Sequence, residues 1–159
     1  MSTHQSSLLM VLESAEKARD EALSQLEAQR KAYDAARQQA QSLVDWRKEY
    51  QQRWQGQFRQ SGGMEIVRCY QDFMHRLSDA VSDQDVRVNQ AQQHLERCRL
   101  ELIERERKVA AVSKLIDKRM LEALARRNRQ EQKATDEMAA RTVRVSSALS
   151  GHPLAGTSL

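Results

Sequence analysis

The chain has 159 residues and a formal net charge of +4, with 30% charged and only 4% aromatic residues. So few large apolar side chains cannot fill a thick globular interior, and a thin seam between helices is expected instead. Proline occurs once, at Pro153, which also favours long uninterrupted helices. The longest wholly apolar run, residues 8–12, is too short to cross a membrane, and it does not resemble a secretory signal.

The first predicted helix covers about residues 8–59. Apolar side chains recur there with an alternating spacing of three and four residues, which is the pattern of a coiled coil. Eleven of the 14 positions in this stripe are apolar or aromatic. The stripe comprises Leu8, Leu12, Ala15, Arg19, Ala22, Leu26, Gln29, Tyr33, Ala36, Ala40, Leu43, Arg47, Tyr50 and Trp54.

A turn is predicted at residues 60–63, where Gly62 and Gly63 let the chain reverse because glycine adopts positive φ angles without cost. A second helix follows over about residues 64–149 and has the same spacing. Its stripe comprises Ile66, Tyr70, Phe73, Leu77, Ala80, Gln84, Arg87, Ala91, Leu95, Cys98, Leu102, Arg105, Val109, Val112 and Ile116. Gln84 and Arg87 interrupt it, and the neighbouring Val81 and Val88 indicate a small drift of phase.

A turn centred near residue 62 brings together residues whose numbers sum to about 125. Apolar positions then meet along the whole first helix, as in the pairs Trp54 with Tyr70, Leu43 with Val81 and Leu8 with Ile116. The predicted fold class is therefore all-α, with two long helices in an antiparallel coiled-coil hairpin that forms a single domain over residues 1–149. The second helix extends beyond the first as an overhang over residues 118–149, and the tail 150–159 is predicted to be disordered.

No arrangement of residues indicates catalysis. The glycines form no phosphate-binding loop, the four histidines are scattered, and the carboxylates alternate with Lys and Arg on solvent faces. Cys69 and Cys98 lie roughly 43 Å apart along one helix, too far for a disulfide, and we interpret them as small buried residues in a reducing compartment. We expect no enzyme, no cofactor and no metal.

The two ends of the predicted hairpin differ in chemistry. Six of the seven aromatic residues lie between residues 46 and 73, where they either staple the hairpin end or form an exposed patch for a partner. Residues 119–159 hold seven Lys and Arg against four Asp and Glu. This segment has no interleaved aromatics and no nucleic-acid motif, so acidic protein loops are a better partner than nucleic acid.

Three blocks around the turn resemble the flagellar export protein FliJ family, and the resemblance covers about residues 8–145. The blocks are Leu-Val-Asp-Trp-Arg-Lys-Glu-Tyr at 43–50, Tyr-Gln-Asp-Phe-Met-His-Arg-Leu at 70–77 and Arg-Gln-Glu-Gln-Lys-Ala-Thr-Asp-Glu at 129–137. The resemblance implies a non-enzymatic coiled coil similar to the gamma-subunit stalk of rotary ATPases. It also implies a cytoplasmic location, peripheral to the inner membrane at the flagellar base.

Members of the family bind the hexameric export ATPase at the open end of the coil and contact the export gate protein FlhA. They help to couple proton-motive force to export, and some handle empty export chaperones. The gate-binding surface of the family maps onto Gln39, Leu43, Trp46, Tyr50, Phe73, Leu77, Ala80 and Gln84. The ATPase-facing end corresponds to residues 8–19 and 119–129, which contain Arg19, Arg119, Arg126, Arg127 and Arg129.

Two alternatives stay open. The chain fits the equivalent stalk of a virulence type III secretion injectisome, which has the same shape. It also fits a dimeric coiled-coil scaffold protein, whereas a hairpin that pairs with itself is expected to be monomeric.

Overall fold

The computed structural model describes residues 3–58, 60 and 63–151, and within them it contains two long helices and no strand. Helix α1 spans Thr3–Phe58 and helix α2 spans Met64–Ser150. The predicted all-α class is confirmed. Helix α1 begins five residues earlier than expected, because the apolar stripe starts only at Leu8. The preceding polar residues continue the helix, and the Ser6 hydroxyl donates to the Thr3 carbonyl at 2.9 Å.

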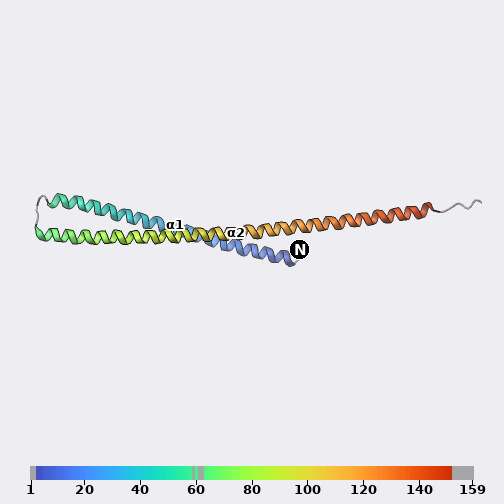
Figure 1. The fold of residues 1–159 in the computed structure, drawn as a ribbon, viewed down its shortest axis with the longest axis horizontal. Helices are drawn as coiled ribbons and strands as arrows, with labels where there is room; N and C mark the ends of the chain where they lie inside the picture. Colours follow the sequence, from blue (N-terminus) through green and yellow to red (C-terminus); the bar gives the residue numbers. More distant parts are fainter. Residues whose placement is uncertain (1–2, 59, 61–62, 152–159) are drawn as a thin grey trace, which may run out of the picture. The chain divides into compact units, whose positions relative to one another are not determined.

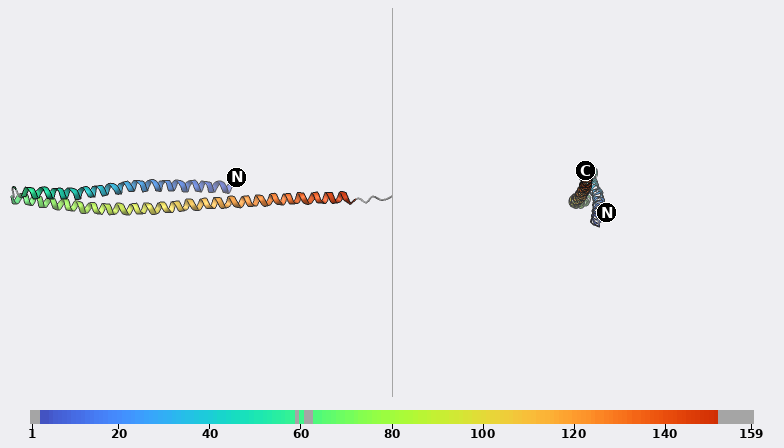
Figure 2. Two further views of the ribbon diagram at one scale, coloured as in Figure 1. Left: turned by 90° about the horizontal axis from the view of Figure 1, so that it is seen from above. Right: turned by 90° about the vertical axis from the view of Figure 1, so that its right-hand side faces the viewer.

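The chain divides into two compact units. Residues 10–110 form the first, which we call the hairpin unit; residues 1–9 and 111–159 form the second, which we call the terminal unit. Helix α2 contributes to both. Within the hairpin unit α1 and α2 run side by side in opposite directions, and the two helices cross in the view of Figure 1. The perpendicular view in Figure 2 shows the same pairing, as expected for a supercoiled pair.

A thin apolar seam holds the hairpin unit together. Ala15, Ala22, Leu26 and Val81 are buried. The other predicted seam positions of this unit are half-buried, apart from the buried Gln84 and the exposed Tyr50, Ile66, Phe73 and Arg87. Alanine therefore supplies much of the interface, and the seam is narrow because its side chains are short.

The phase of the seam shifts in the middle of α2. Arg87, which the regular spacing assigns to the seam, is exposed, and the half-buried Val88 occupies the seam instead. That position was predicted wrongly, while the drift indicated by Val81 and Val88 is confirmed. The cause is the mismatch between the 3.6-residue helix turn and a strict seven-residue repeat.

Gln84 is the one buried polar residue of the seam among the described residues, with 4% of its surface exposed. Its side-chain amide reaches across to α1 and donates a hydrogen bond to the Ala36 carbonyl at 3.1 Å. A buried amide without such a partner would be costly, so this bond explains how glutamine is tolerated there.

Charged side chains contribute little to the pairing of the helices. Every ion pair found among the described residues lies within one helix, mostly at a spacing of three or four positions, as between Glu49 and Arg53 at 2.7 Å. Exposed pairs of this kind contribute only a few tenths of a kcal/mol each, about 0.3–0.5. Apolar burial in the seam therefore stabilises the hairpin unit.

At the turn, the Gln60 amide donates to the Gln57 carbonyl at 3.0 Å, and the Val67 amide donates to the Gly63 carbonyl at 3.3 Å. Gly63 therefore caps the start of α2, and Glu65 in the first turn suits the positive end of the helix dipole. Gly63 does not adopt a positive φ angle, contrary to the expectation for the glycine pair. Gly62, the other half of that expectation, lies outside the described residues.

In the terminal unit, Leu8 of α1 is half-buried and Ile116 of α2 is buried. From residue 117 to residue 151 every side chain is exposed, so this part of α2 lacks a covering partner. Helix α2 ends at Ser150, and most of the predicted tail, residues 152–159, lies outside the described residues. No described helix has the length and apolar character that crossing a membrane requires.

Candidate protein-binding surfaces

The eight residues expected to bind the export gate lie on two facing helix surfaces of the hairpin unit. Residues 39, 43, 46 and 50 follow a spacing of four, three and four along α1, and residues 73, 77, 80 and 84 repeat that spacing along α2. Each set therefore occupies one face of its helix. The Tyr50 and Phe73 rings meet across the seam with centroids 5.0 Å apart, so the structure brings the two sets together.

Two ring pairs link the helices near the turn. Tyr50 and Phe73 meet edge to face at 66°, and the Trp54 and Tyr70 rings lie 5.3 Å apart at 42°. The predicted pairing of Trp54 with Tyr70 is confirmed. Such pairs stabilise by about 0.5–1.5 kcal/mol beyond the burial of their area. The stapling interpretation of the aromatic cluster therefore holds for these four rings.

Three residues of the aromatic cluster are also exposed. The exposed fraction is 54% for Trp46, 38% for Tyr50 and 40% for Phe73. Trp46 has no ring contact among the described residues, unlike Tyr50 and Phe73. A largely exposed indole is the kind of side chain that anchors protein interfaces. We call Trp46, Tyr50 and Phe73 the aromatic surface.

The other five residues expected to bind the export gate, which we call with the aromatic surface the gate set, differ in accessibility. Gln39 is exposed, while Leu43, Leu77 and Ala80 are half-buried at the edge of the seam. Gln84 is buried, and its amide is already bonded to Ala36. Gln84 therefore supports the seam beneath the surface, whereas Gln39 and the aromatic surface are accessible to a partner.

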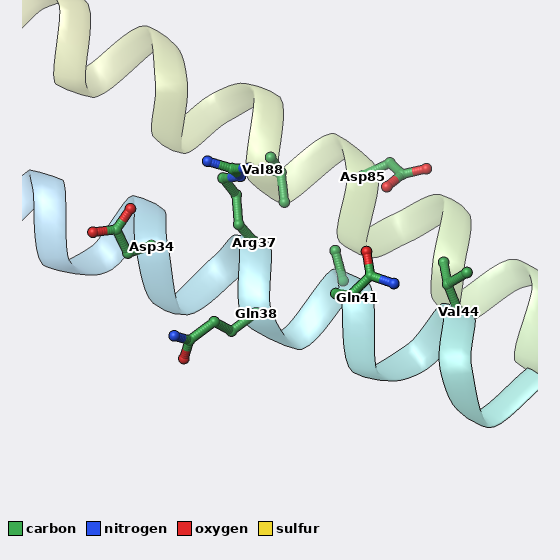
Figure 3. Close-up of a pocket in the computed structure, with 8 residues that line it drawn as sticks. Asp34, Arg37, Gln38, Gln41, Val44, Asp85 and Val88 are labelled. Atoms are coloured by element: carbon green, nitrogen blue, oxygen red, sulfur yellow. The ribbon is translucent and has the colours of Figure 1, made fainter.

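A shallow groove of about 560 Å³ lies on the opposite edge of the seam. Figure 3 shows Arg37 extending toward Val88 of α2, while the Asp85 carboxylate points away from Arg37 and Asp34 faces outward. The Arg37 guanidinium lies 5.6 Å from the centroid of the Tyr33 ring. Sequence reasoning did not single out this groove, which forms where the short side chain of Ala40 leaves the seam thin.

The arginines expected to face the ATPase divide between the two units. Arg19 belongs to the hairpin unit and pairs with Asp20 at 3.1 Å. In the terminal unit, Arg127 pairs with Glu131 at 3.1 Å, whereas Arg119, Arg126 and Arg129 form no ion pair with any residue that the structure describes. These three exposed guanidinium groups are available to an acidic partner.

The described residues contain no group of His, Cys, Asp and Glu that could hold a metal ion. Both cysteines are free thiols in the structure. The interpretation of Cys69 as a buried residue is wrong, because it is exposed. Its position at the start of α2 lies outside the seam stripe.

Comparison with known proteins finds one family and one solved structure that match most of the chain. The model of the family described as "Flagellar FliJ protein" matches residues 4–148. A solved structure of CT670 from Chlamydia trachomatis, described as a candidate YscO homolog, superposes with a TM-score of 0.53 and 19% identity, covering 91% of this chain and 93% of that one. At that identity the likeness concerns the fold. No curated protein sequence matches the chain significantly.

Proposed function

The chain belongs to the FliJ family of flagellar proteins, and we propose that it is the non-enzymatic stalk of a flagellar type III export apparatus. In this role it binds the hexameric export ATPase and the export gate protein FlhA at the cytoplasmic face of the inner membrane. The observation that carries the proposal is the family match over residues 4–148, which spans both helices and both candidate surfaces.

The chemistry of the two surfaces supports two partners. The aromatic surface offers partly exposed rings fixed on paired helices, which suits a preformed apolar contact with the gate. The exposed part of α2 from residue 117 onward carries unpaired arginines, which suit acidic loops of the ATPase. A partner that covers this segment also supplies the packing that an isolated helix in water lacks.

The proposal is tested by measuring ATP hydrolysis by the cognate export ATPase with and without the full chain. We expect the chain to raise the hydrolysis rate or promote hexamer assembly, and to have no hydrolysis of its own. Capture of the FlhA cytoplasmic domain on the immobilised chain tests the second partner. An unchanged rate and unchanged assembly would count against the ATPase role, irrespective of gate binding.

The equivalent stalk of a virulence injectisome is the second candidate, because the solved structure that this chain resembles in fold is described as a candidate YscO homolog. The family match favours the flagellar assignment. Parallel binding assays with a flagellar and an injectisome ATPase from one organism discriminate the two. Light scattering tests the dimeric scaffold: we expect a monomer, because the seam of the hairpin unit is completed within one chain.

A further inference from the structure

A notch lies within the terminal unit, between the first turns of α1 and the part of α2 that follows Ile116. Its volume is about 300 Å³. Leu8, Ile116 and Ala123 form an apolar floor, Arg119 and Arg126 form a positively charged rim, and His4 and Gln5 complete the lining. We call these seven residues the basic notch.

The notch arises where the seam pattern of α2 continues but changes character. After Ile116 the same spacing of three and four residues leads to Arg119, Ala123 and Arg126. All three line the notch, so these positions still face the start of α1. Two arginines thus occupy places where apolar side chains would have extended the seam. The sequence signal for this placement is the continuation of the three- and four-residue spacing beyond Ile116.

Neither arginine is neutralised by another described residue. Within the described part of the chain Arg119 and Arg126 form no ion pair, and the Arg126 Nε donates to the backbone carbonyl of Glu122 at 3.5 Å rather than to its carboxylate. Across the notch, residues 3–9 of α1 contain no Asp or Glu. The acidic residues nearest in sequence, Asp117 for Arg119 and Glu122 for Arg126, lie on the same helix as the arginines.

The charge of the whole terminal unit has the same sign. Residues 111–159 hold nine Lys and Arg against five Asp and Glu, and residues 1–9 hold none of either, so this unit carries +4. That equals the formal net charge of the whole chain, and the hairpin unit is therefore neutral. An acidic partner is attracted to the terminal unit in particular.

The shape and chemistry of the notch select the kind of group that fills it. A guanidinium group binds a carboxylate through two parallel N–H donors, and two of them flank an apolar floor that can cover methylene groups. A glutamate side chain, with two methylenes and a carboxylate, combines both features. Nucleic acid is a poorer match, because the terminal unit contains no aromatic residue on which bases could stack.

We propose that the basic notch receives a glutamate side chain of the export ATPase and thereby fixes the position of the stalk on the ATPase. This inference rests on the proposed function. It assigns the ATPase contact to a defined site formed by both helices, with Leu8 and His4 from α1, rather than to the positive charge of α2 in general.

The test compares two double variants of the full chain that remove the same charge from α2. R119A/R126A alters the rim of the notch, and R141A/R144A removes two exposed arginines outside it. Affinity for the purified cognate ATPase is measured by fluorescence anisotropy at one fixed salt concentration. We expect at least a tenfold loss for the notch variant and less than a threefold loss for the control. Circular dichroism verifies that both variants retain the helical content of the wild type.

A third variant, Ala123→Leu, fills the floor without changing the charge and is expected to lower the affinity at least fivefold. Equal losses of ATPase affinity in both double variants, together with an unchanged affinity of Ala123→Leu, would overturn the assignment of the contact to the notch. The ATPase role of the stalk would then still stand. Absence of ATPase binding by the wild-type chain would overturn both. Binding of a 30-nucleotide DNA in preference to the ATPase would likewise overturn the proposed occupant.

Discussion

The hairpin unit and the terminal unit use the same helix, α2, in opposite ways. In the hairpin unit the apolar stripe of α2 is covered by α1, the charges balance, and rings meet across the seam. In the terminal unit α2 is exposed from residue 117 onward and carries the entire net charge of the chain. The comparison teaches that a long helix can be stabilised internally along one part and keep another part for a partner.

The largest expected effect comes from placing a charge in the seam. Val81 is 8% exposed, so in Val81→Asp a carboxylate is buried without a partner, and we expect a loss of about 3 kcal/mol in the free energy of unfolding. The matched control is Val86→Asp on the same helix, where the side chain is 53% exposed and a change within about 0.5 kcal/mol is expected. Urea denaturation followed by circular dichroism measures both. Equal destabilisation would contradict the placement of the seam.

Substitutions in the aromatic surface distinguish its contribution to the stability of the hairpin unit from its contribution to gate binding. Phe73→Ala removes the ring contact with Tyr50, and we expect it to lower the free energy of unfolding by about 1 kcal/mol and also to weaken binding of the FlhA cytoplasmic domain. Trp46→Ala removes a more exposed ring that contacts no other described ring, so gate affinity should fall about tenfold with stability unchanged. Isothermal titration and thermal denaturation check the two quantities. If Trp46→Ala binds the FlhA cytoplasmic domain with unchanged affinity, the aromatic cluster serves only to hold the two helices together near the turn.

Substitutions of Gln84 test whether this residue contacts the gate directly or only supports the seam beneath the binding surface. Gln84→Ala loses the hydrogen bond to Ala36, and we expect a loss of about 1 kcal/mol in stability. Gln84→Leu replaces the amide with an apolar group of similar size and should be neutral or stabilising. Both variants should retain gate affinity within about twofold. A selective loss of gate affinity in Gln84→Leu, at unchanged stability, would instead assign Gln84 a direct contact.

The smallest effect on stability is expected for truncation after residue 129. The removed residues are exposed throughout their described part, so the midpoint of thermal unfolding should stay the same, with a change in free energy within about 0.5 kcal/mol. Helical content falls in proportion to the residues removed. Truncation after residue 109 is the control, because it also removes the buried Ile116, and it should lower the midpoint. A lower midpoint for the chain truncated after residue 129 would mean that residues 130–159 stabilise the fold.

Much of the fold is readable from spacing alone. The stripes through Leu26 and Val109 predict two helices, and the pairing of Trp54 with Tyr70 follows from the position of the turn. This works because the three- and four-residue spacing is a local property, and an antiparallel pair has one register once the turn is located. The start of α1 could not be predicted in this way, since the residues before Leu8 are polar and carry no stripe.

The sequence by itself determined the all-α class, the unequal lengths of the helices, the concentration of aromatics at residues 46–73 and the basic character of the C-terminal quarter. Each of these depends on composition or on the order of neighbouring residues. Only the tertiary structure decided that Gln84 is buried while Trp46 is exposed, although both belong to the gate set. It also decided that Arg119 and Arg126 share a notch with Leu8. The reason is that burial depends on how far each side chain lies from the line of contact between the helices, and that line drifts around the helix where 3.6 residues per turn meet a seven-residue repeat.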